Sequence, residues 1–195
     1  VRIAREIHDG MAQILAYVLV AARLKGGTGD GISATAGKPH DTRHILHAAG
    51  LRPDEAVHRI GPHVPQRGPF VHWAFGTIGL AVRWSGWDAP FLRYPPDRPA
   101  PLRRFVYRRT WFFDQKLEQA IETGIEQVVI LGAGWDVRAW GLLADRDVEV
   151  FEVDTPATQE VKKRAVEAGC LPLDAVHFVC TDFEEKTWLE ALTEA

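Results

Sequence analysis

Two segments of the sequence combine residue types and a spacing that could bind a small molecule. Residues 128–131 are an apolar run that ends in Gly132-Ala133-Gly134, a pattern typical of a buried strand that turns sharply into the next element. Because glycine has no side chain, the backbone of this turn can approach a ligand closely. A second apolar run, residues 150–153, ends in Asp154, which lies 22 positions after Gly132. This spacing predicts a carboxylate at the tip of the neighbouring strand, where it can accept hydrogen bonds from the ribose of a nucleoside-containing cofactor.

The elements that must position these residues follow from the alternation of apolar runs and helical patterns after residue 102. Thr155 is a good N-cap, with Pro156 at the first helical position and Gly169 at the end of that helix. Short apolar strands that alternate with helices predict an α/β fold with a parallel sheet, covered on both faces, in the spatial order 3-2-1. The predicted strands are 127–131, 149–153 and 176–180, and the other predicted helices are 110–123, 136–144 and 184–193.

The sequence ends before such a sheet would be complete. A doubly wound sheet continues beyond its first three strands, whereas this sequence stops at Ala195. The strand at 127–131, which belongs at the centre of the finished sheet, would be left with an open edge. We therefore expect residues 108–195 to be a half-domain that is truncated at its C-terminus.

The first half of the chain has weaker patterns. Residues 1–25 predict one amphipathic helix, with apolar side chains at three- and four-residue steps. Residues 26–39 have the Gly/Ser/Thr/Ala composition of a flexible linker. Residues 40–107 are expected to be helical and irregular, with short helices near 42–50 and 53–60, and no chemistry can be assigned to them.

Composition argues against several classes of function. A net charge of −3 gives no basic face for nucleic acid. The longest nearly uncharged stretch, residues 69–82, is too short to span a membrane, so a cytoplasmic protein is expected. Cys180 lies inside an apolar run, which predicts a buried, reduced thiol. Six histidines lie between residues 40 and 72; they are His40, His44, His47, His58, His63 and His72. Only the pairs His40/His44 and His44/His47 could share one face of a helix, and no cysteine or carboxylate completes a ligand set, so no metal site is expected.

The choice of cofactor depends on the glycine turn and on the third strand. A dinucleotide fingerprint would need a third glycine where Val137 stands, which weakens the nicotinamide interpretation. The third strand is followed by Asp182 and Phe183, an acid and an apolar residue that would lie beside an adenine pocket. In S-adenosylmethionine enzymes this position commonly holds the adenine amino group and ring. The pattern therefore favours S-adenosyl-L-methionine.

Four motifs occur in an order that resembles the leucine carboxyl methyltransferase family and its bacterial S-adenosylmethionine-dependent relatives. They are RTWFFD at 109–114, VILGAGWDVR at 129–138, FEVDTP at 151–156 with Lys162 beyond it, and FVCTD at 178–182. The similarity covers residues 108–195. It departs from the family at Trp135, Val137 and Trp140, where other aromatic, hydroxyl or polar residues are expected.

The resemblance implies a partial class I methyltransferase fold, which is Rossmann-like, and a set of site residues. In the family's pattern, Arg109 pairs with the methionine carboxylate of the cofactor, and Gly132, Ala133 and Gly134 line it. Asp154 holds the ribose, and Asp182 with Phe183 holds the adenine.

The resemblance also implies O-methylation, with a carboxylate acceptor on a small molecule or a peptide. A carboxylate is already ionised at neutral pH and needs no general base, whereas a hydroxyl acceptor would need one. No such base is evident in the sequence, and no catalytic residue is assigned. Whether the truncated chain turns over stays open.

The N-terminal helix supports a different interpretation. Residues 2–13 resemble the phosphoacceptor helix of sensor histidine kinases, in which His8 would be phosphorylated and the apolar stripe would form a dimer seam. Nothing later in the sequence resembles the ATP-binding domain of such a kinase. A kinase dimerisation fragment and a nicotinamide-dependent oxidoreductase half-domain remain as alternatives.

Simpler roles for the same residues also stay open. The glycine turn could connect a strand and a helix without a ligand, and Asp154 or Asp182 could cap the helix that follows it. Arg109 belongs to a basic cluster with Arg103, Arg104 and Arg108, and such clusters are usually solvated.

Overall fold

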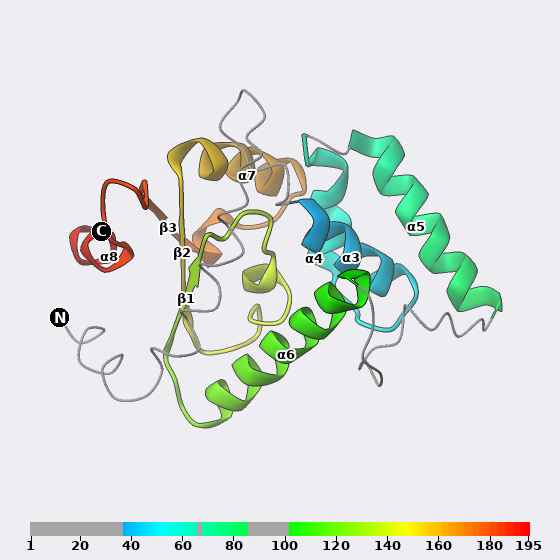
Figure 1. The fold of residues 1–195 in the computed structure, drawn as a ribbon, viewed down its shortest axis with the longest axis horizontal. Coiled ribbons are helices and arrows are strands. Elements are labelled where there is room, and N and C mark those ends of the chain that lie inside the picture. Colours follow the sequence, from blue (N-terminus) through cyan, green and yellow to red (C-terminus); the bar gives the residue numbers. More distant parts are fainter. Residues whose placement is uncertain (1–36, 66–67, 86–101) are drawn as a thin grey trace.

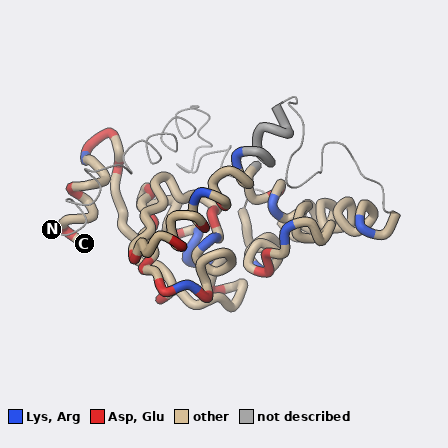
Figure 2. The backbone as a smooth tube through the Cα atoms, turned by 90° about the horizontal axis from the view of Figure 1, so that it is seen from below, with Lys and Arg blue, Asp and Glu red and all other residues tan. Residues whose placement is uncertain are grey.

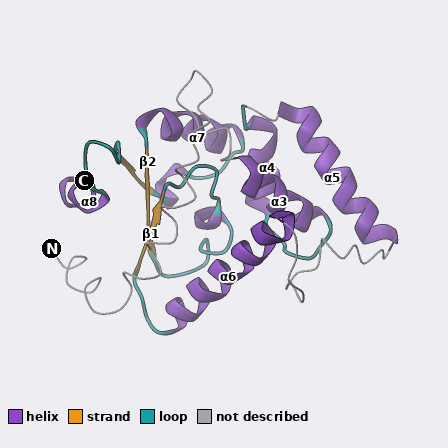
Figure 3. Ribbon diagram, in the orientation of Figure 1, coloured by secondary structure: helices purple, strands orange, loops and turns teal. Residues whose placement is uncertain are grey.

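The C-terminal half of the chain is built around a parallel sheet. In this computed structural model, residues 37–65, 68–85 and 102–195 are described. Within them, β1 (Gln127–Leu131), β2 (Glu149–Asp154) and β3 (His177–Cys180) form a parallel sheet in the order β1-β2-β3 (Figures 1 and 3). This arrangement confirms the predicted α/β fold, strand positions and strand order.

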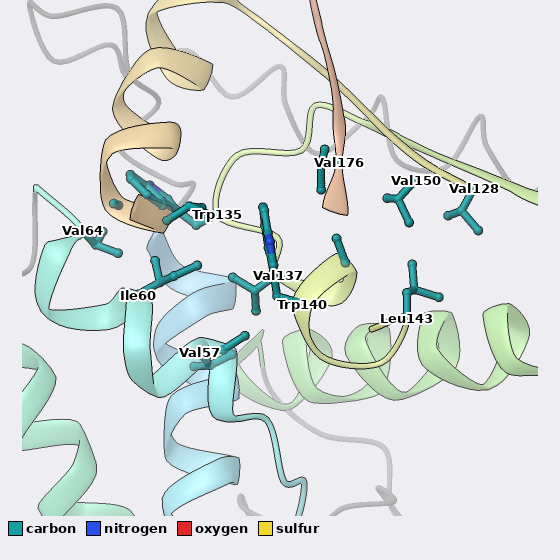
Figure 4. Packing of buried hydrophobic residues seen from close by; sticks show 14 residues of the cluster. Val57, Ile60, Val64, Val128, Trp135, Val137, Trp140, Leu143, Val150 and Val176 are labelled. Atoms are coloured by element: carbon teal, nitrogen blue, oxygen red, sulfur yellow. The ribbon is translucent and has the colours of Figure 1, made fainter. Parts of the chain in front are cut away.

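The two faces of the sheet have separate apolar cores, because successive strand residues point to opposite sides. On one face, Val128 and Val150 belong to the larger core cluster. On the other face, Leu131, Val153 and Val179 pack against α8 (Trp188–Glu194). Figure 4 shows the larger cluster, in which Trp135, Val137 and Trp140 from the segment after β1 meet Val57, Ile60 and Val64 from the N-terminal half.

Two longer helices complete the larger core. The helix α7 (Pro156–Ala168) buries one face, with Thr158, Gln159, Lys162 and Ala165 at helical spacing toward the sheet. It begins with Pro156 after Thr155 and ends at Gly169, as predicted, although the Thr155 hydroxyl donates to Thr158 rather than capping the helix. The helix α6 (Leu102–Glu122) contributes Leu117 and Ile121 to the same core.

The N-terminal part of the described chain is helical. The helix α3 (Gly37–Ala48) begins inside the predicted linker 26–39, and α4 (Glu55–Ile60) confirms the short helix expected at 53–60. A 3₁₀ turn (Gly61–His63) directly follows α4 and precedes α5 (Gly68–Ser85). The helix α5 packs on α3. Gly79 of α5 allows this close approach, because a Cβ there would lie 2.6 Å from the Cβ of Ala48.

The helix α5 projects from the rest of the molecule and lies at the opposite end from α8 (Figure 1). It carries a single charged residue, Arg83, so it is almost uniformly uncharged in Figure 2. Much of its apolar surface is exposed, including Phe70, Trp73 and Trp84. No helix in the described ranges is both long enough and apolar enough to pass through a bilayer.

Three expectations from the sequence are wrong. The predicted helix 136–144 is only a 3₁₀ turn, Arg138–Trp140. Val137, Ala139, Trp140 and Leu143 all pack into the larger core, and Gly141 interrupts the segment with φ −121° and ψ −96°. The last helix begins at Trp188 rather than at 184, because Thr187 and Glu190 form a capping box. Cys180 is exposed rather than buried, because it ends the edge strand β3 and the neighbouring Val179 faces the core.

Candidate functional site

A sharp bend follows the carboxyl end of β1. Gly132 and Gly134 have φ values of +60° and +47°, a left-handed conformation that side chains other than glycine rarely adopt. The N–H groups of Gly132 and Ala133 donate to the carbonyl oxygen of Val153, at 2.8 and 3.4 Å. The bend is therefore held against the carboxyl end of β2, and Ala133 is buried beneath it.

The carboxylate of Asp154 lies directly at this bend. Its Oδ2 accepts a hydrogen bond from the N–H of Gly134 at 2.6 Å, and its Oδ1 accepts from the N–H of Thr155 at 2.7 Å. Each carboxylate oxygen has a second lone pair, so both can accept a further donor. The predicted meeting of the glycine turn and the acid on the next strand is therefore found in the structure.

The residues after β3 lie at the same edge of the sheet. Cys180 is the register partner of Asp154, and the N–H of Thr181 donates to the Asp154 carbonyl at 3.0 Å. Asp182 is exposed, and its Oδ1 accepts from the N–H of Glu184, so it caps a turn and not the final helix. Phe183 packs beside the core on the α8 face of the sheet. An acid and an apolar ring thus follow β3 next to Asp154.

Positive charge is concentrated beside the bend. Arg109 on α6 is half-buried and forms no ion pair with any described side chain. Burial lowers the pKa of its guanidinium, and the neighbouring Arg43 and Arg138 lower it further, while Asp136 has the opposite effect. Arg109 is therefore a desolvated cation near Asp136, which lies two residues after the bend. Such a group is well suited to an incoming carboxylate.

A buried chain of ion pairs connects this region to the N-terminal helices. Arg43 of α3 donates to Asp136 at 2.9 Å, and Arg138 donates both to Asp136 and, at 2.8 Å, to Asp114 of α6. Asp114 also accepts from Arg52 at 2.6 Å, and Arg52 donates to Asp54, the N-cap of α4. We call these six residues the Arg–Asp network; they are Arg43, Arg52, Asp54, Asp114, Asp136 and Arg138.

The six described side chains of the Arg–Asp network carry three positive and three negative charges. Burial would raise the pKa of the Asp136 carboxyl, but Arg138 and Arg43 outweigh it and hold that pKa far below its usual range. The pKa of Asp114 is lowered in the same way by Arg138 and Arg52, against the effect of burial. Both acids are therefore ionised at neutral pH. Sequence reasoning missed this network, although Asp114, Asp136 and Arg138 lie inside the motifs that resemble the family.

A second buried pair lies on the same face of β2 as Asp154. Glu152 and Lys162 are both fully buried, with 2.6 Å between Oε2 and Nζ. Burial raises the pKa of Glu152 to about 7, and Lys162 only partly opposes this. The Oε1 atom of Glu152 has no hydrogen-bond partner among the described residues. The feature of the sequence that could have indicated this buried pair is the charged residue Glu152 inside the apolar run 150–153.

Helix α7 is tied to both neighbouring strands beneath the site. The side-chain amide of Gln159 donates to the carbonyls of Glu152 and Val179, at 2.8 and 2.9 Å. A separate pocket, lined in part by Val148, Glu149 and His177, lies at the amino ends of the strands. It is therefore at the opposite edge of the sheet from the glycine bend.

Comparisons with known proteins agree with this geometry. A chain from Mycobacterium ulcerans is 32% identical over 157 residues, which cover 76% of this chain and 50% of that protein. One from Mycobacterium marinum is 41% identical over 155 residues (76% and 49%), and one from Mycobacterium tuberculosis is 38% identical over 140 residues (65% and 44%). Each is named provisionally as an S-adenosyl-L-methionine-dependent methyltransferase.

This chain thus spans about half the length of the curated relatives that it matches. The model of one family, described as leucine carboxyl methyltransferase, matches residues 87–195, which is more than half of the chain and includes the bend, Asp154 and the residues after β3. The chain belongs to the leucine carboxyl methyltransferase family.

Proposed function

We propose that this chain forms the cofactor-binding half of an S-adenosyl-L-methionine-dependent O-methyltransferase. The observation that carries the proposal is the contact between Asp154 and Gly134, which brings an acid from β2 against a left-handed glycine bend after β1. The relatives named as S-adenosyl-L-methionine-dependent methyltransferases support the choice of cofactor.

Each site residue would have a role that its surroundings allow. The exposed backbone at Gly132 would lie against the cofactor, while Asp154 would use its remaining lone pairs for the ribose hydroxyls. Arg109 would pair with the methionine carboxylate, because it is a half-buried cation without a described carboxylate partner. Asp182 and Phe183 would contact the adenine, since both follow β3 beside Asp154.

The chemistry needs little from the protein beyond positioning. The cofactor supplies a methyl group bonded to a sulfonium, which is already activated for in-line displacement. A carboxylate acceptor would form a new O–CH₃ bond as the S–CH₃ bond breaks, and no proton has to be removed. The residues of this half would therefore hold the cofactor and exclude water from one side of it. The preference for a carboxylate acceptor rests on membership of the family.

One feature of the bend argues against a nicotinamide dinucleotide. In dinucleotide-binding sheets, the N-terminus of an α-helix follows the glycine turn and binds the pyrophosphate. Here the residues after Gly134 form a 3₁₀ turn, and Val137 is fully buried in the core. S-adenosylmethionine has no phosphate and needs no such helix.

The kinase interpretation rests on His8, which lies outside the described residues. Its phosphorylation, and dimerisation through residues 1–25, stay predictions. Incubation with labelled ATP and a partner kinase domain tests them, and an unlabelled His8 would remove this alternative.

Calorimetric titration with S-adenosylhomocysteine and with NAD tests the proposed cofactor. We expect S-adenosylhomocysteine to bind, and Asp154→Asn to weaken it about 10- to 100-fold, because a charge-assisted hydrogen bond contributes roughly 1.5–3 kcal/mol. Asp174→Asn is the matched control, since Asp174 is exposed and lies at the other edge of the sheet. Unchanged binding in Asp154→Asn, or tighter binding of NAD than of S-adenosylhomocysteine, would refute the assignment.

The acceptor class is tested by the base stability of the methylated product. A methyl ester releases methanol in mild base, whereas a methyl ether does not. Labelled product from the reaction should therefore yield volatile label after base treatment. A stable product would exclude the carboxylate acceptor while leaving the cofactor assignment intact.

A further inference from the structure

Three histidines from three different helices meet in the N-terminal half of the chain. They are His44 of α3, His58 of α4 and His72 of α5, and one potential ligand atom from each lies within 4.8 Å of the other two. The rings of His44 and His72 stack with centroids 3.9 Å apart, and the ring of His58 lies 5.0 Å from that of His72. The residues are separated by 14 positions each, so no local motif marks them in the sequence.

The most buried of the three histidines has a ring nitrogen that forms no hydrogen bond with any described residue. His44 is only 2% exposed, and its Nε2 has no hydrogen-bond partner among the described residues. The backbone of α5 comes close to this atom, because a Cβ on Gly76 would lie 3.6 Å from it. A buried nitrogen without a partner is costly, and the Nε2 of His44 is therefore available to a ligand.

Two of the three rings are enclosed by protein, because His44 is buried and His72 is half-buried. A neutral imidazole has one nitrogen lone pair that is free to bind a cation. His47 is also close, but its Nδ1 accepts from the N–H of Asp54 and its Nε2 lies 3.8 Å from Glu55.

We propose that His44, His58 and His72 bind a divalent transition-metal ion of the kind that prefers imidazole, of which Zn²⁺ is the commonest in proteins. Three histidine nitrogens are a known ligand set for zinc, at about 2.0–2.1 Å, and leave one position for water or another ligand. Because His44 and His72 stack in nearly parallel planes and the ligand atoms lie up to 4.8 Å apart, binding requires at least one of these rings to rotate until the nitrogen lone pairs converge. His58 is exposed and gives the ion a route from solvent.

The ion would attach α5 to α3 and α4. Gly79 is the one buried residue in α5, while the helix exposes large apolar side chains such as Trp73 and Trp84. Apart from the close contact with α3 at Gly79, α5 therefore has little apolar burial to hold it. A metal bond from His72 to two other helices would add a crosslink, and the site is separate from the residues proposed to bind the cofactor.

Zinc titration of chelator-treated protein without a histidine tag tests the site. Isothermal calorimetry should give one Zn²⁺ per chain, and Co²⁺ should give a d–d absorption band of a low-coordinate nitrogen site. At a hundredfold excess over Kd, Zn²⁺ should raise Tm by about 5–10 °C. Absence of stoichiometric binding would overturn the proposal.

Two variants identify the ligands. His58→Asn should weaken Zn²⁺ binding by more than about 100-fold, and it should fold because His58 is exposed. Gly61→Ala keeps all three histidines but should also weaken binding, because the new Cβ would lie 2.1 Å from Nδ1 of His72 and displace its ring.

His177→Asn is the control, since His177 is exposed and lies on β3. It should bind Zn²⁺ as the unaltered chain does. Equal Zn²⁺ affinity in His58→Asn and the unaltered chain would refute the assignment. Affinity for S-adenosylhomocysteine should be the same in both, which separates this test from that of the proposed cofactor.

Discussion

Replacing Asp114 by Asn should strongly destabilise the protein, because Asp114 is the centre of the Arg–Asp network. It is only 3% exposed and accepts from Arg52 at 2.6 Å and from Arg138 at 2.8 Å. Without its charge, the buried guanidiniums of Arg52 and Arg138 lose a partner, and the six described side chains of the network gain one net positive charge. Breaking a buried ion pair by removing one partner costs roughly 3–5 kcal/mol, and two charge-assisted hydrogen bonds give a similar sum.

Urea denaturation followed by circular dichroism measures this loss. We expect Asp114→Asn to lower the free energy of unfolding by about 3–5 kcal/mol, and Tm by roughly 6–20 °C. A double-mutant cycle with Arg52→Met should give a coupling energy of at least about 1 kcal/mol, since the two side chains are in direct contact. Asp174→Asn, at an exposed position, should change stability by less than about 0.5 kcal/mol.

The pH dependence gives an independent check. The pKa of Asp114 in the folded protein is below its usual value of 3.8, because Arg138 and Arg52 outweigh burial. The stability that Asp114 contributes is therefore fully present above pH 3.8 and is lost as pH falls through the lower folded pKa. The difference between the unaltered chain and Asp114→Asn should be constant above about pH 5 and shrink below pH 4. A loss under 1 kcal/mol at pH 7, or one that grows in acid, would refute this account.

Three other predictions concern single residues. Gly134→Ala should lower the free energy of unfolding by about 1–2 kcal/mol, because φ is +47° at this position. It should also weaken the binding of S-adenosylhomocysteine measured by calorimetry, and an unchanged affinity would argue against a ligand at the bend. Burial raises the pKa of Glu152 from 4.5 to about 7. The free energy of unfolding should therefore fall by about 3 kcal/mol as pH rises from 4.5 to 7, because the folded state holds the proton more tightly. In urea denaturation at different pH values, Glu152→Gln should lack this dependence. Thr187→Ala removes the capping box of α8 and should lower the free energy of unfolding by about 1 kcal/mol, whereas Thr193→Ala near the end of that helix should not.

The strands and the glycine–acid contact could be predicted because they depend on local patterns. Apolar runs of five or six residues between helices specify buried parallel strands, and the carboxyl ends of such strands meet at one edge. The position of Asp154 follows from these two rules alone. The 3₁₀ turn at Arg138–Trp140 could not be predicted in this way, because Trp135, Val137 and Trp140 are held by side chains from α4 and β2 that are distant in sequence.

The buried charges could not be predicted for a related reason. Arg52 and Asp114 are 62 residues apart, and Arg43 and Asp136 are 93 apart, so no spacing rule connects them. The same holds for His44, His58 and His72, whose helices meet through the packing of α3, α4 and α5 in the folded chain. A charged residue in the sequence is most often exposed, and only its partner makes burial favourable.

The Arg–Asp network also explains why the bend keeps its shape without a following helix. In a dinucleotide-binding sheet the helix after the glycines orients the backbone. Here Asp136 does so instead: its Oδ1 accepts from the N–H of Arg138 at 2.9 Å, while Arg43 and Arg138 hold its other oxygen. The bend is thus anchored on one side by Asp154 and on the other by Asp136, which α3 reaches through Arg43. The N-terminal helices therefore contribute to the geometry of the site, although none of their residues is proposed to contact the cofactor. Replacing Asp136 by Asn should weaken the binding of S-adenosylhomocysteine in calorimetry, because the bend would lose the contacts that hold its shape.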